Sequence, residues 1–170
     1  PKNSYLRDIF VFASFTALSF VDIKELSNDQ IVEVNGEKWI ISKRHKTGVP
    51  FQVKLLDIPL QIIERYKAFQ ENNLVFPNLN YWSICKRMGK MIKECGITKK
   101  ISFHCSRHGF ATLALSKGMP IESVSRILGH TNIETTQIYA KITVQKLDND
   151  LTMLGDKLSK SFGNVKIAGI

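Results

Sequence analysis

A histidine and an arginine stand three residues apart in the segment His104-Cys105-Ser106-Arg107. If this segment is helical, residues at this spacing share one face, so the imidazole and the guanidinium point at the same place. Such a pair can bind an anion and move a proton. Alone the pattern is weak, because a basic protein contains such tetrads by chance, with the arginine in solvent and the histidine satisfying the backbone.

A second candidate group is Leu128-Gly129-His130-Thr131, with Tyr139 nine positions after His130. Gly129 permits a sharp turn that ends one helix, so we expect the His130 ring to be presented at a helix junction. Tyr139, on the next helix, is within reach of the same pocket. Taken without these neighbours, Tyr139 is more typical of an aromatic side chain at the edge of a core.

Together these residues resemble the signature of the tyrosine recombinases. The order and spacing match at His104-x-x-Arg107, Gly109, Ala111-Thr112, Leu128-Gly129-His130 and Tyr139. The resemblance covers residues 4–158 and implies a catalytic domain over residues 1–158, followed by a flexible tail over residues 159–170. Because the sequence begins at Pro1, we expect a fragment that lacks the N-terminal core-binding domain of the family.

The resemblance implies cleavage and religation of DNA without a metal or any other cofactor. Tyr139 would attack a phosphodiester and form a 3′-phosphotyrosine intermediate. Arg107 would stabilise charge on the phosphate oxygens, while His104 and His130 would donate to them or help move the tyrosine proton. The expected function is site-specific recombination and integration of a mobile element, with a homotetramer assembled on double-stranded attachment sites.

In the family, a lysine on a β-hairpin gives a proton to the leaving sugar oxygen. Lys46, in Arg44-His45-Lys46-Thr47-Gly48, is the matching position. The nearby Lys43 is an alternative to it, and a solvated turn lysine is the plainer interpretation.

The sequence departs from the family at one phosphate-binding position. The family usually reads Thr-Gly-Leu-Arg where this chain reads Thr16-Ala17-Leu18-Ser19, so Ser19 replaces the first arginine. Asp22 follows where a carboxylate commonly supports the site. A serine here resembles the integrases of Bacteroidetes conjugative and mobilisable transposons. We therefore predict an active enzyme in which Arg44 assists Arg107, because alternation in a strand would put Arg44 and Lys46 on one face.

Three other interpretations remain open. The missing arginine favours a decayed recombinase that binds DNA without turnover, and a type IB topoisomerase would share the chemistry. A zinc site is the third, at His104, His108, Cys95 and Cys105, but it lacks the short C-x-x-C spacing that structural zinc usually requires. We therefore expect no metal, and we expect His108 to be a neighbour of the site.

The remaining pattern predicts a mainly α-helical fold with a small three-stranded antiparallel sheet, an α+β domain. We expect helices over residues 4–18, 21–26, 59–70, 81–95, 103–117, 120–128 and 132–139, and strands near 31–34, 39–41 and 51–55. Asn35-Gly36 and Thr47-Gly48 are the hairpin turns. Ser102 and Asn132 are expected N-caps.

A last helix carries one apolar stripe with alternating spacings of three and four residues, formed by Val144, Leu147, Leu151, Leu154 and Leu158. The stripe must be covered, either by the chain's own domain or, as the resemblance suggests, by a neighbouring subunit in a ring of four.

Charge and composition agree with a DNA-binding protein. The 170 residues include 24 Lys+Arg against 15 Asp+Glu, a net charge of +9, which suits a polyanion but equally a soluble basic protein. Three cysteines are too few and too irregular for a disulfide framework, and the longest apolar stretch, residues 9–21, is too short to span a bilayer. We expect a bacterial cytoplasmic protein associated with the nucleoid.

Overall fold

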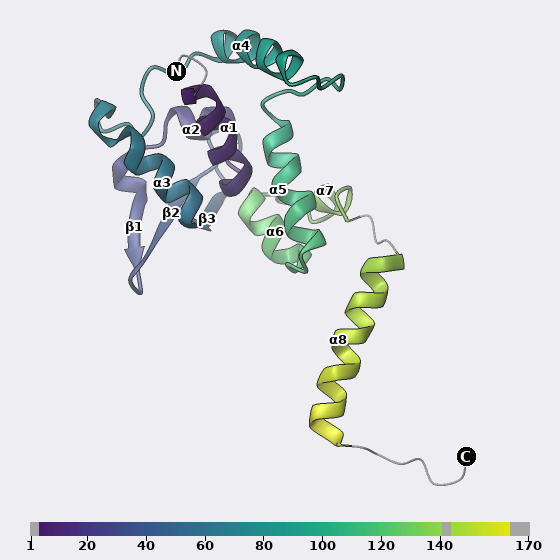
Figure 1. Cartoon of the computed structure of the whole chain (residues 1–170). Coiled ribbons are helices and arrows are strands. Elements are labelled where there is room, and N and C mark those ends of the chain that lie inside the picture. Colours follow the sequence, from purple (N-terminus) through teal and green to yellow (C-terminus); the bar gives the residue numbers. More distant parts are fainter. Residues whose placement is uncertain (1–3, 141–143, 164–170) are drawn as a thin grey trace, which may run out of the picture. The chain divides into compact units, whose positions relative to one another are not determined.

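The computed structural model describes residues 4–140 and 144–163, and the chain forms two compact units, residues 1–139 and 140–170. The division into compact units falls after Tyr139, and the catalytic domain over residues 1–158 stays a prediction. The first unit contains α1 (Ser4–Thr16), α2 (Phe20–Lys24), η1 (Asn28–Gln30), β1 (Ile31–Val34), β2 (Glu37–Lys43), β3 (Pro50–Lys54), α3 (Asp57–Tyr66), η2 (Lys67–Phe69), α4 (Tyr81–Glu94), α5 (Cys105–Ser116), α6 (Ile121–Leu128) and α7 (Glu134–Gln137) (Figure 1). The predicted fold class, mainly α with a small antiparallel sheet, is confirmed.

The sheet has the strand order β1-β2-β3, and both pairs are antiparallel. Ile40 on the central strand pairs with Ile31 on one side and Val53 on the other. Asn35 and Gly36 connect β1 to β2 with φ angles of 53° and 76°, a left-handed conformation that these two residue types adopt readily. Buried Ile40 and Val53 fix the register, which brings the β2–β3 connection to the edge of the core.

Helix α1 is the centre of the first unit. It packs against α3, α4 and α5, and α6 packs against both α5 and β3 (Figure 1). The buried residues of α1 are the apolar Leu6, Ile9, Phe12 and Ala13 together with the polar Asp8 and Thr16. The apolar residues recur every three to four positions, and they share one hydrophobic core with the sheet and α2.

The second unit contains α8 (Val144–Phe162). This helix continues beyond the predicted end at Leu158, while residues 164–170 of the predicted tail lie outside the described residues. The predicted apolar stripe is present, since Leu147, Leu151, Leu154 and Leu158 are each about half exposed along it. Within the described ranges, every helix is too short or too polar to cross a membrane.

Candidate active site

One cavity of about 990 Å³ in the first unit collects most of the residues singled out from the sequence. Its lining comes from five places that are distant in the chain: α2 with the residues around it, the β2–β3 connection, the start of α4, the start of α5 and the end of α6. Of the predicted site residues, the lining includes Ser19, Arg44, Lys46, His104, Arg107 and His130. The spatial convergence on which the predicted chemistry depends is therefore present for these side chains.

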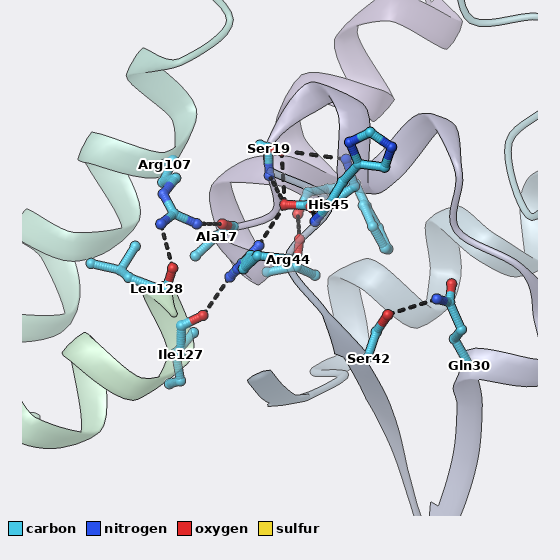
Figure 2. A network of polar contacts seen from close by, with 12 residues as sticks. Ala17, Ser19, Gln30, Ser42, Arg44, His45, Arg107, Ile127 and Leu128 are labelled. Carbon is cyan, nitrogen blue, oxygen red and sulfur yellow. Dashed lines mark hydrogen bonds and ion pairs between the residues drawn. The ribbon is translucent and has the colours of Figure 1, made fainter. Parts of the chain in front are cut away.

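The last turn of α6 binds two arginines from different elements. Arg107 Nη2 donates to the carbonyl oxygen of Leu128, and Arg44 Nη2 donates to that of Ile127 (Figure 2). The final carbonyls of a helix have no partner within the helix and form the negative end of its dipole. The end of α6 is therefore a natural place for two guanidinium groups.

Arg107 is also held from the end of α1, because its Nη1 donates to the carbonyl oxygen of Ala17 at 2.9 Å (Figure 2). Ala17 has a φ of 57°, which an alanine adopts only at a cost in free energy. Burial and the nearby Arg44 guanidinium lower the pKa of Arg107 to about 10. Both arginines remain charged at neutral pH, and their proximity in a half-buried cavity favours an anion there.

Arg44 is the most deeply buried cation of the site, with 5% of its surface exposed. Its Nη1 donates to Asp22 Oδ2 at 2.7 Å, and its Cζ lies 3.9 Å from the centre of the Phe51 ring. Burial lowers the pKa of Arg44, and the Asp22 carboxylate opposes that effect. The ion pair, the α6 carbonyl and the aromatic ring together hold this guanidinium at the cavity wall.

Asp22 connects the position of the missing arginine to the β2–β3 connection. Ser19 caps α2: its Oγ accepts from the Asp22 backbone amide and donates to Asp22 Oδ2 at 2.7 Å. The backbone amide of His45 donates to Asp22 Oδ1 at 3.1 Å. Although burial alone would raise it, the pKa of Asp22 is lowered by Arg44 and these hydrogen bonds. Ser19 thus serves as a helix cap, and Asp22, three residues later, forms the ion pair with Arg44.

His130 is positioned by a residue that sequence reasoning missed. Its Nδ1 lies 2.8 Å from the hydroxyl of Thr136, which is fully buried. Burial and the charges of Arg107 and Arg44 lower the pKa of His130, so its ring is neutral at pH 7. The only signal for Thr136 in the sequence is a hydroxyl residue one turn before Tyr139, and this does not distinguish a buried side chain from the exposed Thr135 beside it.

Tyr139 does not line this cavity, but the ring of His108 connects it to the lining residue His104. The Tyr139 ring centroid is 5.1 Å from that of His108, and the His108 centroid is 4.4 Å from that of His104. Burial raises the pKa of Tyr139, although Arg107 acts in the opposite direction. The phenol is therefore protonated at neutral pH, and His108 is the neighbour that links it to His104.

Two of the differences between predicted and observed helix bounds affect residues of the site. Helix α5 begins at Cys105 instead of residue 103, because the amides of Cys105 and Ser106 bond three residues back and form a tight turn over buried Phe103. His104 is thus at the N-terminal boundary of α5, one turn before His108. Helix α7 spans only Glu134–Gln137, so Tyr139 follows it and is not on a helix.

The predicted strand alternation of Arg44 and Lys46 is wrong. Strand β2 ends at Lys43, and a loop closed by the hydrogen bonds of Arg44 with Val49 and Gly48 follows it. The strand ends because Arg44 turns inward to Asp22.

Lys46 is exposed and lines the cavity, whereas Lys43 lines a separate cavity of about 110 Å³ beside β2. This difference in position distinguishes the two lysines.

The His, Cys, Asp and Glu side chains of residues 4–140 and 144–163 form no group of three that could hold a metal ion. The two histidines of the zinc interpretation, His104 and His108, lie edge to face, and their neighbours include Arg107 and Tyr139.

Comparison with known proteins identifies the family. Residues 1–146 match the family model described as the phage integrase family. The chain belongs to the phage integrase family. It is 31% identical to the tyrosine recombinase XerA of Pyrococcus horikoshii over 139 residues, which cover 74% of this chain and 47% of the relative. It is 41% identical to the tyrosine recombinase XerA of Thermococcus kodakarensis over 141 residues, 74% of this chain and 48% of that protein.

The fold of this phage integrase family chain is also that of solved recombinases. The XerH site-specific recombinase bound to difH substrate superposes with a TM-score of 0.69 at 22% identity, over 88% of this chain and 46% of that one. The Tn1549 transposon integrase in complex with circular intermediate DNA gives a TM-score of 0.70 at 17% identity, over 89% and 63%. The chain spans about half the length of the curated relatives that it matches.

Proposed function

We propose that residues 1–158 act as the catalytic domain of a recombinase that cuts and rejoins DNA in site-specific recombination and integration. The observation that carries the proposal is a single cavity lined by cationic and imidazole side chains: Arg44, Lys46, His104, Arg107 and His130. Such a set fits a phosphodiester under attack, because preorganised positive donors stabilise the charge that develops on its oxygens.

In the proposed reaction, the Tyr139 hydroxyl oxygen attacks the phosphorus atom. The bond from phosphorus to the leaving 5′ oxygen breaks, and a 3′-phosphotyrosine ester forms. The phenolic proton passes to His104 or His130, whose lowered pKa values leave both rings neutral at pH 7. Lys46 gives a proton to the leaving oxygen. One ester replaces another, so the free hydroxyl can reverse the step without a metal or a nucleotide cofactor.

Arg107 and Arg44 are the proposed phosphate clamp. Planar guanidinium groups match two phosphate oxygens at once, which a lysine cannot do. In this proposal Arg44 has the phosphate-binding role of the arginine that Ser19 replaces. Support for this assignment comes from its place beside Arg107 at the end of α6 and from its contact with Asp22, next to Ser19 in the same capping box.

Double-stranded attachment-site DNA is the proposed partner, bound by a homotetramer on paired sites in the bacterial nucleoid. The net charge of +9 supports a polyanionic partner. The XerH recombinase was solved bound to difH substrate and the Tn1549 integrase in complex with a circular intermediate DNA. Since phosphate contacts release counterions, DNA affinity should fall steeply as salt rises from 50 to 200 mM, by about a thousandfold.

A nicked attachment-site duplex tests the proposal, because loss of the short cleaved strand traps the covalent intermediate. We expect a protein–DNA adduct on denaturing gels with the wild-type chain and none with Tyr139→Phe. The matched control is Tyr81→Phe, an exposed tyrosine that also lines the cavity. Binding of the duplex without any adduct would indicate a decayed DNA-binding remnant, and relaxation of a plasmid that lacks the site would indicate a topoisomerase.

The role of Arg44 is tested with Arg44→Ala on the same duplex. Loss of a phosphate-binding cation should slow adduct formation by about a hundredfold. An unchanged rate removes Arg44 from the clamp without affecting the proposal for Tyr139.

A further inference from the structure

Gly129 occupies a crowded place beside Arg44. It ends α6 with a φ of +62°, and a Cβ atom added to it would lie 2.8 Å from Arg44 Cγ and 3.1 Å from Arg44 Nε. Non-bonded carbon atoms prefer a separation of about 3.5–4.0 Å. The absence of a side chain at position 129 therefore makes room for Arg44, in addition to allowing the turn.

This crowding separates Gly129 from other glycines that end helices. Gly118 follows α5 with a φ of +89°, yet a Cβ atom there would meet nothing within 4 Å. The left-handed backbone alone explains Gly118. At Gly129 there is a second reason for a residue without a Cβ atom, which is the position of the Arg44 side chain.

Arg44 cannot easily move away from an added methyl group. Its side chain is held by Asp22, by the Ile127 carbonyl and by the Phe51 ring. Its Nε is buried and has no hydrogen-bond partner among the described residues, which shows how closely the surroundings enclose it. A side chain at position 129 would displace either the Arg44 guanidinium or the turn that leads directly into His130.

We propose that Gly129 is a positioning residue for the reaction: its missing side chain seats Arg44 at the phosphate-binding cavity. The inference rests on the assisting role of Arg44 proposed above. Gly129 lines the cavity but has no side chain to bind the phosphate or the leaving group, so its replacement should lower the cleavage rate and leave DNA affinity nearly unchanged.

A double-mutant cycle tests this role. Gly129→Ala is compared in the wild-type and Arg44→Ala backgrounds, with Gly118→Ala as the control for left-handed strain. With Arg44 present, we expect Gly129→Ala to slow adduct formation at saturating protein by about tenfold or more, because small displacements at a reacting centre are costly. In the Arg44→Ala background it should cause no further loss, and Gly118→Ala should leave the rate unchanged in both.

Thermal unfolding gives a second readout that does not require cleavage. Backbone strain lowers the midpoint equally in both backgrounds, whereas the steric clash exists only with Arg44, so Gly129→Ala should cost about 3 °C more in the wild type. If Arg44→Ala does not fold, Arg44→Ala with Asp22→Asn removes both partners of the ion pair and replaces it as the background.

Equal losses in the two backgrounds, in both rate and midpoint, would overturn the proposal. A normal cleavage rate for Arg44→Ala alone would instead overturn the assisting role of Arg44 and, with it, the catalytic part of this inference. The unfolding comparison would then still decide whether Gly129 seats the Arg44 side chain.

Discussion

The guanidinium groups of Arg44 and Arg107 donate to adjacent carbonyl oxygens, those of Ile127 and Leu128, although the two arginines come from a β-hairpin loop and from α5. The turn that ends α6 leaves these carbonyls available, because the amides of Gly129 and His130 bond to the carbonyls of Arg126 and Ser125. A helix end thus holds two like charges close together before any anion is bound.

Replacing Arg107 with lysine should impair cleavage more than binding. Lysine keeps the charge but cannot donate at once to Ala17, Leu128 and a phosphate oxygen as the guanidinium can. We expect Arg107→Lys to slow adduct formation by about a hundredfold, with a small change in DNA affinity, since only one phosphate contact changes. Arg126→Lys, an exposed position on α6, is the control and should behave as the wild type. Equal effects of the two variants would contradict this role of Arg107.

Thr136→Val should release the ring of His130. Valine has nearly the same shape but no hydroxyl, so His130 Nδ1 loses its partner and the ring loses its fixed orientation. The expected results are about a tenfold lower cleavage rate and a loss of about 1 kcal/mol in the free energy of unfolding. Thr136→Ser should retain most of the rate, and Thr135→Val, at an exposed neighbour, should change little. A full rate for Thr136→Val would show that His130 needs no such support.

Asp22→Asn should destabilise the first unit strongly. It leaves the Arg44 guanidinium buried without its counter-ion, for which about 3 kcal/mol is expected in urea unfolding at pH 7. Glu37→Gln breaks the exposed ion pair with Lys54 and should cost less than about 1 kcal/mol. Because the pKa of Asp22 is lowered by folding, its stabilising contribution is present above about pH 4 and is lost below it. The variant should therefore show a weaker loss of stability than wild type between pH 4 and 3.

The two histidines of the cavity should make the fold less stable in mild acid. Burial, followed by neighbouring positive charges, lowers the pKa of both His104 and His130 relative to the unfolded chain. Below about pH 6.5 the unfolded chain therefore binds protons that the folded chain does not, so the free energy of unfolding should fall as the pH drops from 7.5 to 5.5. His130→Gln should flatten this slope in urea titrations. An identical slope in the wild type and the variant would argue against the lowered pKa.

Ala17→Gly should stabilise the protein. Ala17 is buried with a left-handed φ of 57°, a conformation that costs an alanine about 1 kcal/mol or more and glycine almost nothing. We expect the thermal midpoint to rise by about 2 °C, with Arg107 still bound to the carbonyl at position 17. Ala13→Gly, in the helical part of α1, should lower the midpoint instead. A similar loss in both variants would show that the strain at Ala17 is already relieved.

Residue types and periodicity predicted the strands, the hairpin turns and the identity of most helices, because these depend on local preferences. Asn35-Gly36 and Gly129 show this: their left-handed conformations follow from the residues themselves. The start of α5 could not be predicted in this way, since Ser102 offers a good cap but buried Phe103 and a tight turn delay the helix to Cys105.

The candidate site was predictable as a set of residues but not as a network. His104, Arg107, His130 and Lys46 were recognised by type and order, and the structure places all four at one cavity. The partners that hold these side chains are set by tertiary structure. A backbone carbonyl is common to every residue type, so the sequence does not mark it as a partner, and the sequence does not distinguish a buried threonine from an exposed one. The inward turn of Arg44 likewise depends on Asp22, which is distant in the sequence, and strand alternation could not reveal it.

Because Arg44 and Arg107 both bind carbonyl oxygens of the last turn of α6, the number of residues in this helix is constrained. One residue inserted into or deleted from α6 would rotate the terminal carbonyls by about 100° and shift them by about 1.5 Å along the axis. Substitutions on its solvent side, at Glu122, Ser123 or Arg126, leave those oxygens in place. The solvent side of the segment can therefore vary in composition, but the number of residues that separate Pro120 from Gly129 cannot change.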